Sequence, residues 1–167
     1  MDLYLLRHGI AVDFGTPGFE RDSERPLVPK GERRLRAAAA AMNKLELSFD
    51  LILCSPYVRA RQTAEIVAGE LKLKKRIEFS DALVPGGNPR VLIQELNGLE
   101  PAPENILLVG HEPHLSRLIA LLASGNMDAA IEMKKGGLCK LEVAELYCGQ
   151  CAKLAWLLTP SQMELMG

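Results

Sequence analysis

The chain lacks an excess of charge of either sign and has no long apolar run. Its 167 residues include 20 lysines and arginines against 21 aspartates and glutamates, so the formal net charge is −1. A chain without a basic excess has no overall field that attracts nucleic acid or an anionic membrane. No apolar stretch approaches the roughly 20 residues that a membrane-spanning helix needs. We therefore expect neither nucleic acid nor a membrane as a partner.

We also expect no secretory signal, since the sequence runs from Met1 directly into a strand pattern. We expect a cytoplasmic location, where a disulfide framework is not expected. Cys54 lies in an apolar run and is predicted to be buried. Cys148 and Cys151 have the spacing of half a zinc site or of a redox motif, with Cys139 the only candidate third ligand. We favour a turn between two strands, and metal binding by this pair stays open.

The chain does contain enough apolar residues to form one hydrophobic core. Apolar residues make up 48% of the chain and charged residues 25%, which is ordinary for a globular protein, and we expect a single domain over residues 1–167. Strand patterns alternate with helix patterns, and two antiparallel strands follow near the end. Such alternation predicts an α/β three-layer sandwich with a mostly parallel sheet and helices on both faces. The expected strands cover 2–6, 50–54, 74–80, 105–109, 138–144 and 153–158, and the expected helices cover 30–45, 55–71, 90–99, a segment from 113 and one from 160.

Two segments between these elements carry further signals. Residues 10–29 have no period and form a long loop, and long loops in compact domains are often functional. Ser55 and Pro56 have the pattern of a helix N-cap followed by proline at the first position. Arg59 and Arg61 then lie in the first turns of that helix, where its dipole favours an anion rather than a cation. Two cations in that place indicate that an anion is expected there.

The first expected strand ends abruptly in Arg7, His8 and Gly9. Arg7 offers a planar cationic fork suited to a phosphoryl or carboxylate group, and His8 can act as a nucleophile or a proton carrier. Gly9 lets the backbone pass close to a ligand. On its own, this triplet is equally compatible with a strand end that merely exposes an arginine and a histidine.

Three expected strands end in reactive groups, and the carboxyl ends of parallel strands meet at one edge of a sheet. Arg7 and His8 follow the first strand, Arg59 lies just beyond the second, and His111 follows the strand that ends at Val109. Two arginines, two histidines and a helix N-terminus suit a phosphoryl group. A metal ion is the competing ligand of two histidines, but the arginines would repel it. We therefore expect neither a metal nor a cofactor.

Three sequence motifs resemble those of the histidine phosphatase superfamily, which includes the phosphoglycerate mutases. They are Arg7-His8-Gly9, the segment Ser55-Pro-Tyr-Val-Arg59-Ala-Arg-Gln-Thr63-Ala64, and Val109-Gly-His111-Glu-Pro113. The short chain and the stretch Asp22-Ser-Glu-Arg25-Pro-Leu27 look more like the SixA-type phosphohistidine phosphatases of this superfamily. The resemblance covers nearly the whole chain and implies a phosphoglycerate mutase-like fold.

The resemblance implies a role for each matching residue. His8 would be the nucleophile and take the phosphoryl group as a phosphohistidine intermediate. It must be neutral to attack, so activity should weaken below a histidine pKa of ~6.5, unless cationic neighbours lower that value. The other residues would hold the phosphoryl oxygens (Arg7, Arg59, His111) or line the pocket (Gly9, Arg25, Ser55).

The expected general acid is missing from its usual place. Larger members of the superfamily carry a carboxylate after the third strand, where this chain has Asp81-Ala-Leu-Val-Pro-Gly-Gly, and they often have a helical insertion over the site. Phosphohistidine has a labile P–N bond and needs less acid help than an alkyl ester, and an open site admits a protein. The resemblance thus implies a phosphohistidine phosphatase that acts on a signalling protein of the histidine-phosphotransfer type. Glu112 and Asp81 remain candidate acids. A small-molecule phosphomonoesterase and a non-catalytic phosphate-binding module are the alternatives.

Overall fold

The computed structural model describes all 167 residues and centres on a six-stranded sheet in the order β3-β2-β4-β1-β5-β6. Parallel pairing joins β3 to β2, β2 to β4 and β4 to β1, and β5 pairs antiparallel with both β1 and β6. Only β5 therefore runs against the other strands, and the sheet is mostly parallel as predicted. The strands are β1 (Asp2–Arg7), β2 (Leu51–Cys54), β3 (Ile77–Phe79), β4 (Asn105–Gly110), β5 (Leu138–Val143) and β6 (Ala152–Leu158).

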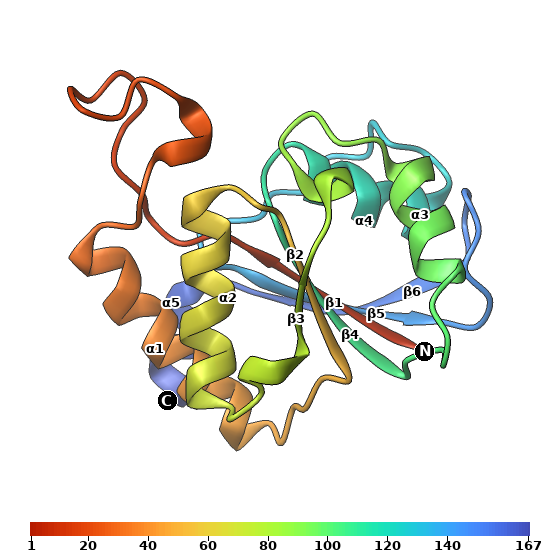
Figure 1. The fold of residues 1–167 in the computed structure, drawn as a ribbon. Coiled ribbons are helices and arrows are strands. Elements are labelled where there is room, and N and C mark those ends of the chain that lie inside the picture. Colours follow the sequence, from red (N-terminus) through yellow and green to blue (C-terminus); the bar gives the residue numbers. More distant parts are fainter.

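Helices cover both faces of this sheet, which confirms the predicted α/β sandwich (Figure 1). One face carries α1 (Pro29–Lys44), α2 (Val58–Glu70) and α5 (Pro160–Met166). The other carries α3 (Pro89–Asn97) and α4 (His114–Ser124). Short 3-10 helices lie at η1 (Asp22–Glu24), η2 (Lys74–Arg76) and η3 (Asp81–Leu83). None of the helices combines the length and apolar character that crossing a membrane requires.

Alternation along the central strands separates two apolar cores. In β1, Leu3 and Leu5 pack under α3 and α4, whereas Tyr4 and Leu6 pack under α1, α2 and α5, and all four side chains are buried. Successive side chains of a strand point to opposite faces, so one strand serves both cores. Burying each leucine side chain contributes roughly 1.5–3 kcal/mol. The sheet is therefore a rigid base for the loops at its carboxyl end.

Two predicted boundaries are wrong. The helix expected from Ser55 begins at Val58 with Tyr57 as its N-cap, and no side chain caps it. The hydroxyl of Ser55 is hydrogen-bonded to His111, 2.8 Å away, and accepts from the amide of Tyr57 at 3.3 Å. The strand expected over 74–80 is confined to β3, because residues 74–76 form η2. Charged side chains in that segment interrupt the apolar pattern that a longer strand would need.

The cysteines are free thiols. Cys54 is fully buried in β2, as predicted. Cys148 is exposed and Cys151 half-buried in the loop between β5 and β6, as the turn interpretation expects. Cys139 is buried in β5. Three or more histidine, cysteine, aspartate or glutamate side chains do not gather anywhere in a way that could hold a metal ion.

Main-chain hydrogen bonds tie the strand ends together at the carboxyl end of the sheet. The amide of His8 donates to the carbonyl of Gly110, and the amide of Ser55 donates to that of Val109, both at 3.0 Å. The long loop 10–28 starts beside these residues and projects beyond the sheet at the end of β1 (Figure 1). At its base, a Cβ on Gly31 would lie 2.2 Å from the carbonyl oxygen of Ile10, so only glycine allows α1 to approach this loop so closely.

Candidate active site

His8 lies at the centre of the converging strand ends, and its side chain is almost fully buried. Its Nδ1 is 2.7 Å from the carbonyl oxygen of Gly9. A carbonyl oxygen only accepts hydrogen bonds, so the proton of the neutral imidazole is on Nδ1 and the lone pair is on Nε2. This tautomer is the one that a nucleophilic Nε2 needs.

Arg59 comes from the first turn of α2 and is almost completely buried. Its Nε donates to His8 Nε2 at 3.2 Å. Its two other guanidinium nitrogens donate to Asp22, one to the main-chain carbonyl at 2.6 Å and one to the carboxylate at 2.9 Å. Arg61 is exposed and lies 3.7 Å from Glu65 on the same helix. Of the two arginines in this helix, only Arg59 belongs to the site.

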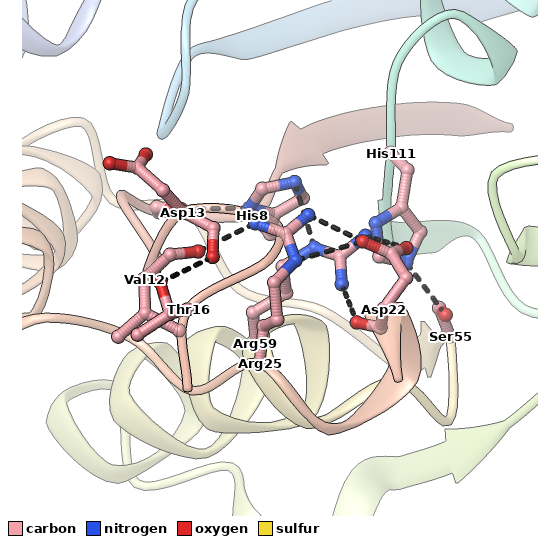
Figure 2. Close-up of polar contacts among 10 residues, drawn as sticks. His8, Val12, Asp13, Thr16, Asp22, Arg25, Ser55, Arg59 and His111 are labelled. Carbon is pink, nitrogen blue, oxygen red and sulfur yellow. Dashed lines mark hydrogen bonds and ion pairs between the residues drawn. The ribbon is translucent and has the colours of Figure 1, made fainter. Parts of the chain in front are cut away.

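Asp22 lies between Arg59 and Arg25 (Figure 2). One carboxylate oxygen accepts from Nε and Nη2 of Arg25 at 2.8 and 2.6 Å, and the other accepts from Arg59. Arg25 also donates to the carbonyl oxygen of Val12 at 2.6 Å. Despite some desolvation of the carboxyl group, the two arginines hold the pKa of Asp22 below its usual value. Arg25 therefore reaches His8 only indirectly, through Asp22 and Arg59.

His111 lies opposite His8, with ring centroids 5.0 Å apart. Its Nε2 is hydrogen-bonded to the Ser55 hydroxyl, and the Tyr57 ring meets it edge-on at 5.2 Å. Tyr57 also lies 5.3 Å below the Arg59 guanidinium, in cation–π geometry. The Nδ1 of His111 is buried without a partner. Two of the predicted site residues, Ser55 and His111, are thus brought together directly.

Arg7 precedes His8 in the chain, but its side chain makes its hydrogen bond outside the cluster around His8. Its Nη1 donates to the carbonyl oxygen of Met133 at 2.6 Å, and its Nε is buried without a partner. No hydrogen bond joins it to the other predicted site residues. Burial lowers its pKa, and the carboxylates of Glu112 and Glu132 partly oppose that shift. The side chain thus contacts the segment that leads into β5.

Gly9 differs from expectation in the way it contributes. Its amide donates to the Thr63 hydroxyl at 3.1 Å, and Thr63 donates in turn to the carbonyl of Arg59 at 2.7 Å. The amide is therefore engaged within the protein, and the carbonyl orients His8. A Cβ on Gly9 would meet Leu35 Cδ1 at 2.7 Å, so the missing side chain serves packing against α1.

Neither candidate acid is directed at His8. A carboxylate oxygen of Glu112 accepts from the amide of Ser116 at 2.9 Å, which satisfies a free amide in the first turn of α4. Asp81 is exposed in η3 and has no side-chain partner. The only carboxylate inside the cluster is Asp22, and its lowered pKa keeps it ionised at neutral pH.

Burial keeps both site histidines neutral. It lowers the pKa of His8 to about 3, with smaller contributions from the charges of Arg59, Arg7 and Lys135. It lowers that of His111 to about 2, with further contributions from His8 and Arg59. The ~6.5 threshold expected for His8 thus moves far down, and desolvation matters more than the cations. The site has neutral nitrogens beside fixed positive charge, which suits an anionic ligand.

Sequence reasoning missed three residues of this cluster. Asp22, Thr63 and Tyr57 all stand in the segments that resemble the superfamily, but the sequence alone predicted no role for any of them. The signal for Thr63 was its position four residues after Arg59, which places both on one face of a helix. Asp22 had no comparable signal, because it lies in a loop without a period.

Comparison with known proteins agrees with the resemblance to the histidine phosphatase superfamily. The sequence profile of the histidine phosphatase superfamily (branch 1) matches residues 3–84. Phosphohistidine phosphatase SixA of Escherichia coli is 30% identical over 127 residues, which cover 75% of this chain and 76% of that protein. The chain belongs to the histidine phosphatase superfamily. It is a phosphatase of this superfamily and falls in its SixA-type branch.

Two further relatives of this superfamily cover most of the chain. An uncharacterized protein of a Picosynechococcus strain is 38% identical over 139 residues, which are 83% of this chain and 82% of that protein. A structure of the protein histidine phosphatase SixA complexed with tungstate superimposes with a TM-score of 0.84 at 25% identity, covering 96% of this chain and 98% of that one. The fold is thus phosphoglycerate mutase-like, as predicted.

Proposed function

We propose that this phosphatase removes the phosphoryl group from phosphohistidine on a signalling protein, with His8 as the nucleophile. The observation that carries the proposal is the hydrogen bond from His8 Nδ1 to the Gly9 carbonyl, at 2.7 Å. It directs the Nε2 lone pair toward Arg59, whose charge attracts the phosphoryl group to that nitrogen.

The reaction runs in two displacements. In the first, His8 Nε2 attacks phosphorus as the P–N bond to the substrate histidine breaks, and the substrate leaves as neutral imidazole when its other nitrogen carries the proton. In the second, water attacks the phosphohistidine formed on His8, which releases inorganic phosphate and restores the neutral nucleophile. The phosphoryl group moves from one imidazole nitrogen to another. The P–N bond that breaks and the P–N bond that forms are therefore of nearly equal energy.

The cationic and neutral groups around Nε2 have distinct tasks in this mechanism. Arg59 and Arg7 stabilise the negative oxygens of the transferring group, where charge is spread in the transition state. His111 and Ser55 form a hydrogen-bonded pair on the opposite side and supply further polar contacts. Arg25 holds Asp22, which holds Arg59, and so acts on the reaction through position.

The arrangement of carboxylates favours phosphohistidine over an alkyl phosphate ester. An alkoxide leaving group needs a proton from a positioned acid. Glu112 is bound to the α4 amide, Asp81 is exposed, and Asp22 is ionised between two arginines. A neutral imidazole leaves without such help. A small-molecule phosphomonoesterase is the second candidate, because the same anion-binding cluster accepts any phosphoryl group.

The test is phosphate release from a phosphohistidine-bearing phosphotransfer domain, with an aryl phosphate as comparator. The wild-type protein should release phosphate from the domain rapidly, and His8→Ala should abolish release because the attacking nitrogen is gone. After a base quench, wild-type enzyme separated from the substrate domain should carry a phosphoryl label that acid removes, since phosphohistidine survives base and is lost in acid.

His114→Ala is the matched control, because His114 is a buried histidine outside the hydrogen-bonded cluster. It should retain activity in every molecule that folds. Release from the aryl phosphate alone would overturn the phosphohistidine assignment and support the esterase. Unchanged release by His8→Ala would overturn the assignment of the nucleophile.

A further inference from the structure

A second cationic cavity opens beside the site, at the same end of the sheet. Its volume is ≈ 510 Å³, and its lining includes Arg7, Arg34, Lys134 and Lys135 together with the turn that leads into α5. Four of the chain's 20 lysines and arginines thus gather around this one cavity. The mechanism above uses only Arg7 among them.

Ion pairs compensate only part of this charge. Arg34 Nε lies 2.9 Å from a carboxylate oxygen of Glu164, and Lys134 contacts Glu132. Lys135 has no carboxylate partner, and Arg7 has only the neutral carbonyl of Met133. The cavity therefore has two cations, Arg7 and Lys135, without an ion pair, although the charges of Glu112 and Glu132 act on Arg7 from a longer distance.

The backbone fixes this cavity relative to the nucleophile. The amide of Gly136 is 3.0 Å from the carbonyl oxygens of both Arg7 and His8, and the amide of Arg7 donates to the carbonyl of Gly137 at 3.1 Å. The lysine pair thus lies on a turn that is hydrogen-bonded to the His8 backbone. The charge of Lys135 also contributes to the lowered pKa of His8, in agreement with their closeness.

We propose that this cavity is a second anion subsite, which binds a carboxylate of the substrate next to the phosphoryl group. Arg7 lies at its boundary with the His8 site. This proposal rests on the proposed function and narrows the substrate class. The substrate would be a phosphohistidine with an aspartate or glutamate close to it, either along the chain or in the folded protein. Arg34 is held by Glu164 and Lys134 by Glu132, so these two cations bind such a carboxylate with little further loss of side-chain entropy.

The test uses two phosphohistidine peptides that differ only in whether glutamates or glutamines flank the phosphohistidine. The wild-type protein should show about a tenfold lower KM for the acidic peptide, with kcat nearly unchanged, a preference that corresponds to one favourable charged contact. In the double variant Lys134→Gln and Lys135→Gln, the preference should shrink to about twofold or less, since Arg34 and Arg7 remain.

The matched control is the double variant Lys74→Gln and Lys75→Gln, which removes the same charge from an adjacent lysine pair in η2. It should keep the tenfold preference if the effect is local. An equal loss in both double variants would mean that only the overall charge matters, and it would overturn the subsite. So would a wild-type protein that does not distinguish the two peptides.

A second measurement separates this proposal from the proposed function. Aryl phosphate hydrolysis is inhibited with a short alkyl phosphonate that carries a carboxylate, and with its amide counterpart. Stronger inhibition by the carboxylate, lost in Lys134→Gln and Lys135→Gln, would support the subsite even if neither peptide is hydrolysed. Equal inhibition by both compounds, together with equal KM values for both peptides, would overturn it.

Discussion

The two ends of the sheet carry opposite charge. At the carboxyl end, the site and the neighbouring cavity contain Arg7, Arg59, Lys134 and Lys135. At the amino end, a cavity of ≈ 470 Å³ is lined by the acidic side chains of Asp50, Glu78, Glu100 and Glu104. One six-residue strand, β1, separates the two ends by roughly 20 Å.

Carboxylates have different partners at the two ends. At the amino end, Asp50 accepts from the amides of Glu104 and Asn105, at 3.0 and 2.9 Å, and lies 3.4 Å from a single arginine, Arg76. At the carboxyl end, Asp22 is bound by two arginines of the site. A net charge near zero thus hides an uneven distribution, with an acidic cavity at one end and a basic cavity at the other. Substitutions at each end should therefore differ in their effect on catalysis.

The largest effect is expected from Arg59→Gln. The change removes the cation that contacts His8 Nε2, so we expect kcat/KM for the phosphohistidine domain to fall by about 10³-fold, as for loss of a transition-state donor. Arg61→Gln is the matched control on the same helix, and because Arg61 is exposed, it should change kcat/KM by less than about twofold. Similar losses in both variants would contradict the assignment of Arg59 to the site.

Acid should destabilise the carboxyl end through its histidines. Burial lowers the pKa of His8 to about 3, of His111 to about 2 and of His114 to about 4. Between pH 6.5 and about 4, the unfolded chain binds protons that the folded protein does not, so stability present above pH 6.5 is lost as the pH falls. From pH 7.5 to 5.5, each histidine should lower the free energy of unfolding by about 1.4 kcal/mol, or about 4 kcal/mol together.

Urea unfolding at the two pH values measures this loss. His114→Leu replaces a buried imidazole that makes no hydrogen bond, so the pH-dependent loss should be smaller by about 1.4 kcal/mol in this variant. His8 remains neutral over the same range, so any change in activity per folded molecule should follow protonation of the substrate imidazole and not of His8. A free energy of unfolding that is equal at both pH values would refute the buried, neutral state of these side chains.

A smaller effect is expected from Asp22→Asn. The amide keeps one oxygen acceptor but loses the charge that holds Arg25 and Arg59, so kcat/KM should fall by about tenfold. Asp13→Asn, in the exposed part of the same loop, is the matched control and should have no measurable effect. An increase in activity for Asp22→Asn would show instead that the carboxylate competes with the phosphoryl group for the arginines.

The sequence was sufficient to predict the sheet, its helices and the convergence of His8, Arg59 and His111, because strand ends are located by apolar patterns that tertiary contacts rarely override. It was insufficient for Asp22, since the loop 10–28 has no period and its path depends on contacts with α2. The N-cap at Ser55 was wrong because the helix begins only at Val58, and the Ser55 hydroxyl binds the Tyr57 amide and a distant partner, His111. Local sequence patterns predict helices and strands well, whereas contacts between side chains that are distant in the sequence can be assigned only once the fold is known.

The smallest effect is expected at the amino end. The double variant Glu100→Gln and Glu104→Gln removes two negative charges from the acidic cavity. Since roughly 20 Å separates this end from His8 and the Debye length at physiological salt is about 8 Å, kcat/KM should change by less than about twofold. Steady-state assays at low and physiological salt measure the change. A tenfold change at physiological salt would mean that the two ends are not electrostatically independent, and the acidic end would then help to set the affinity for anions.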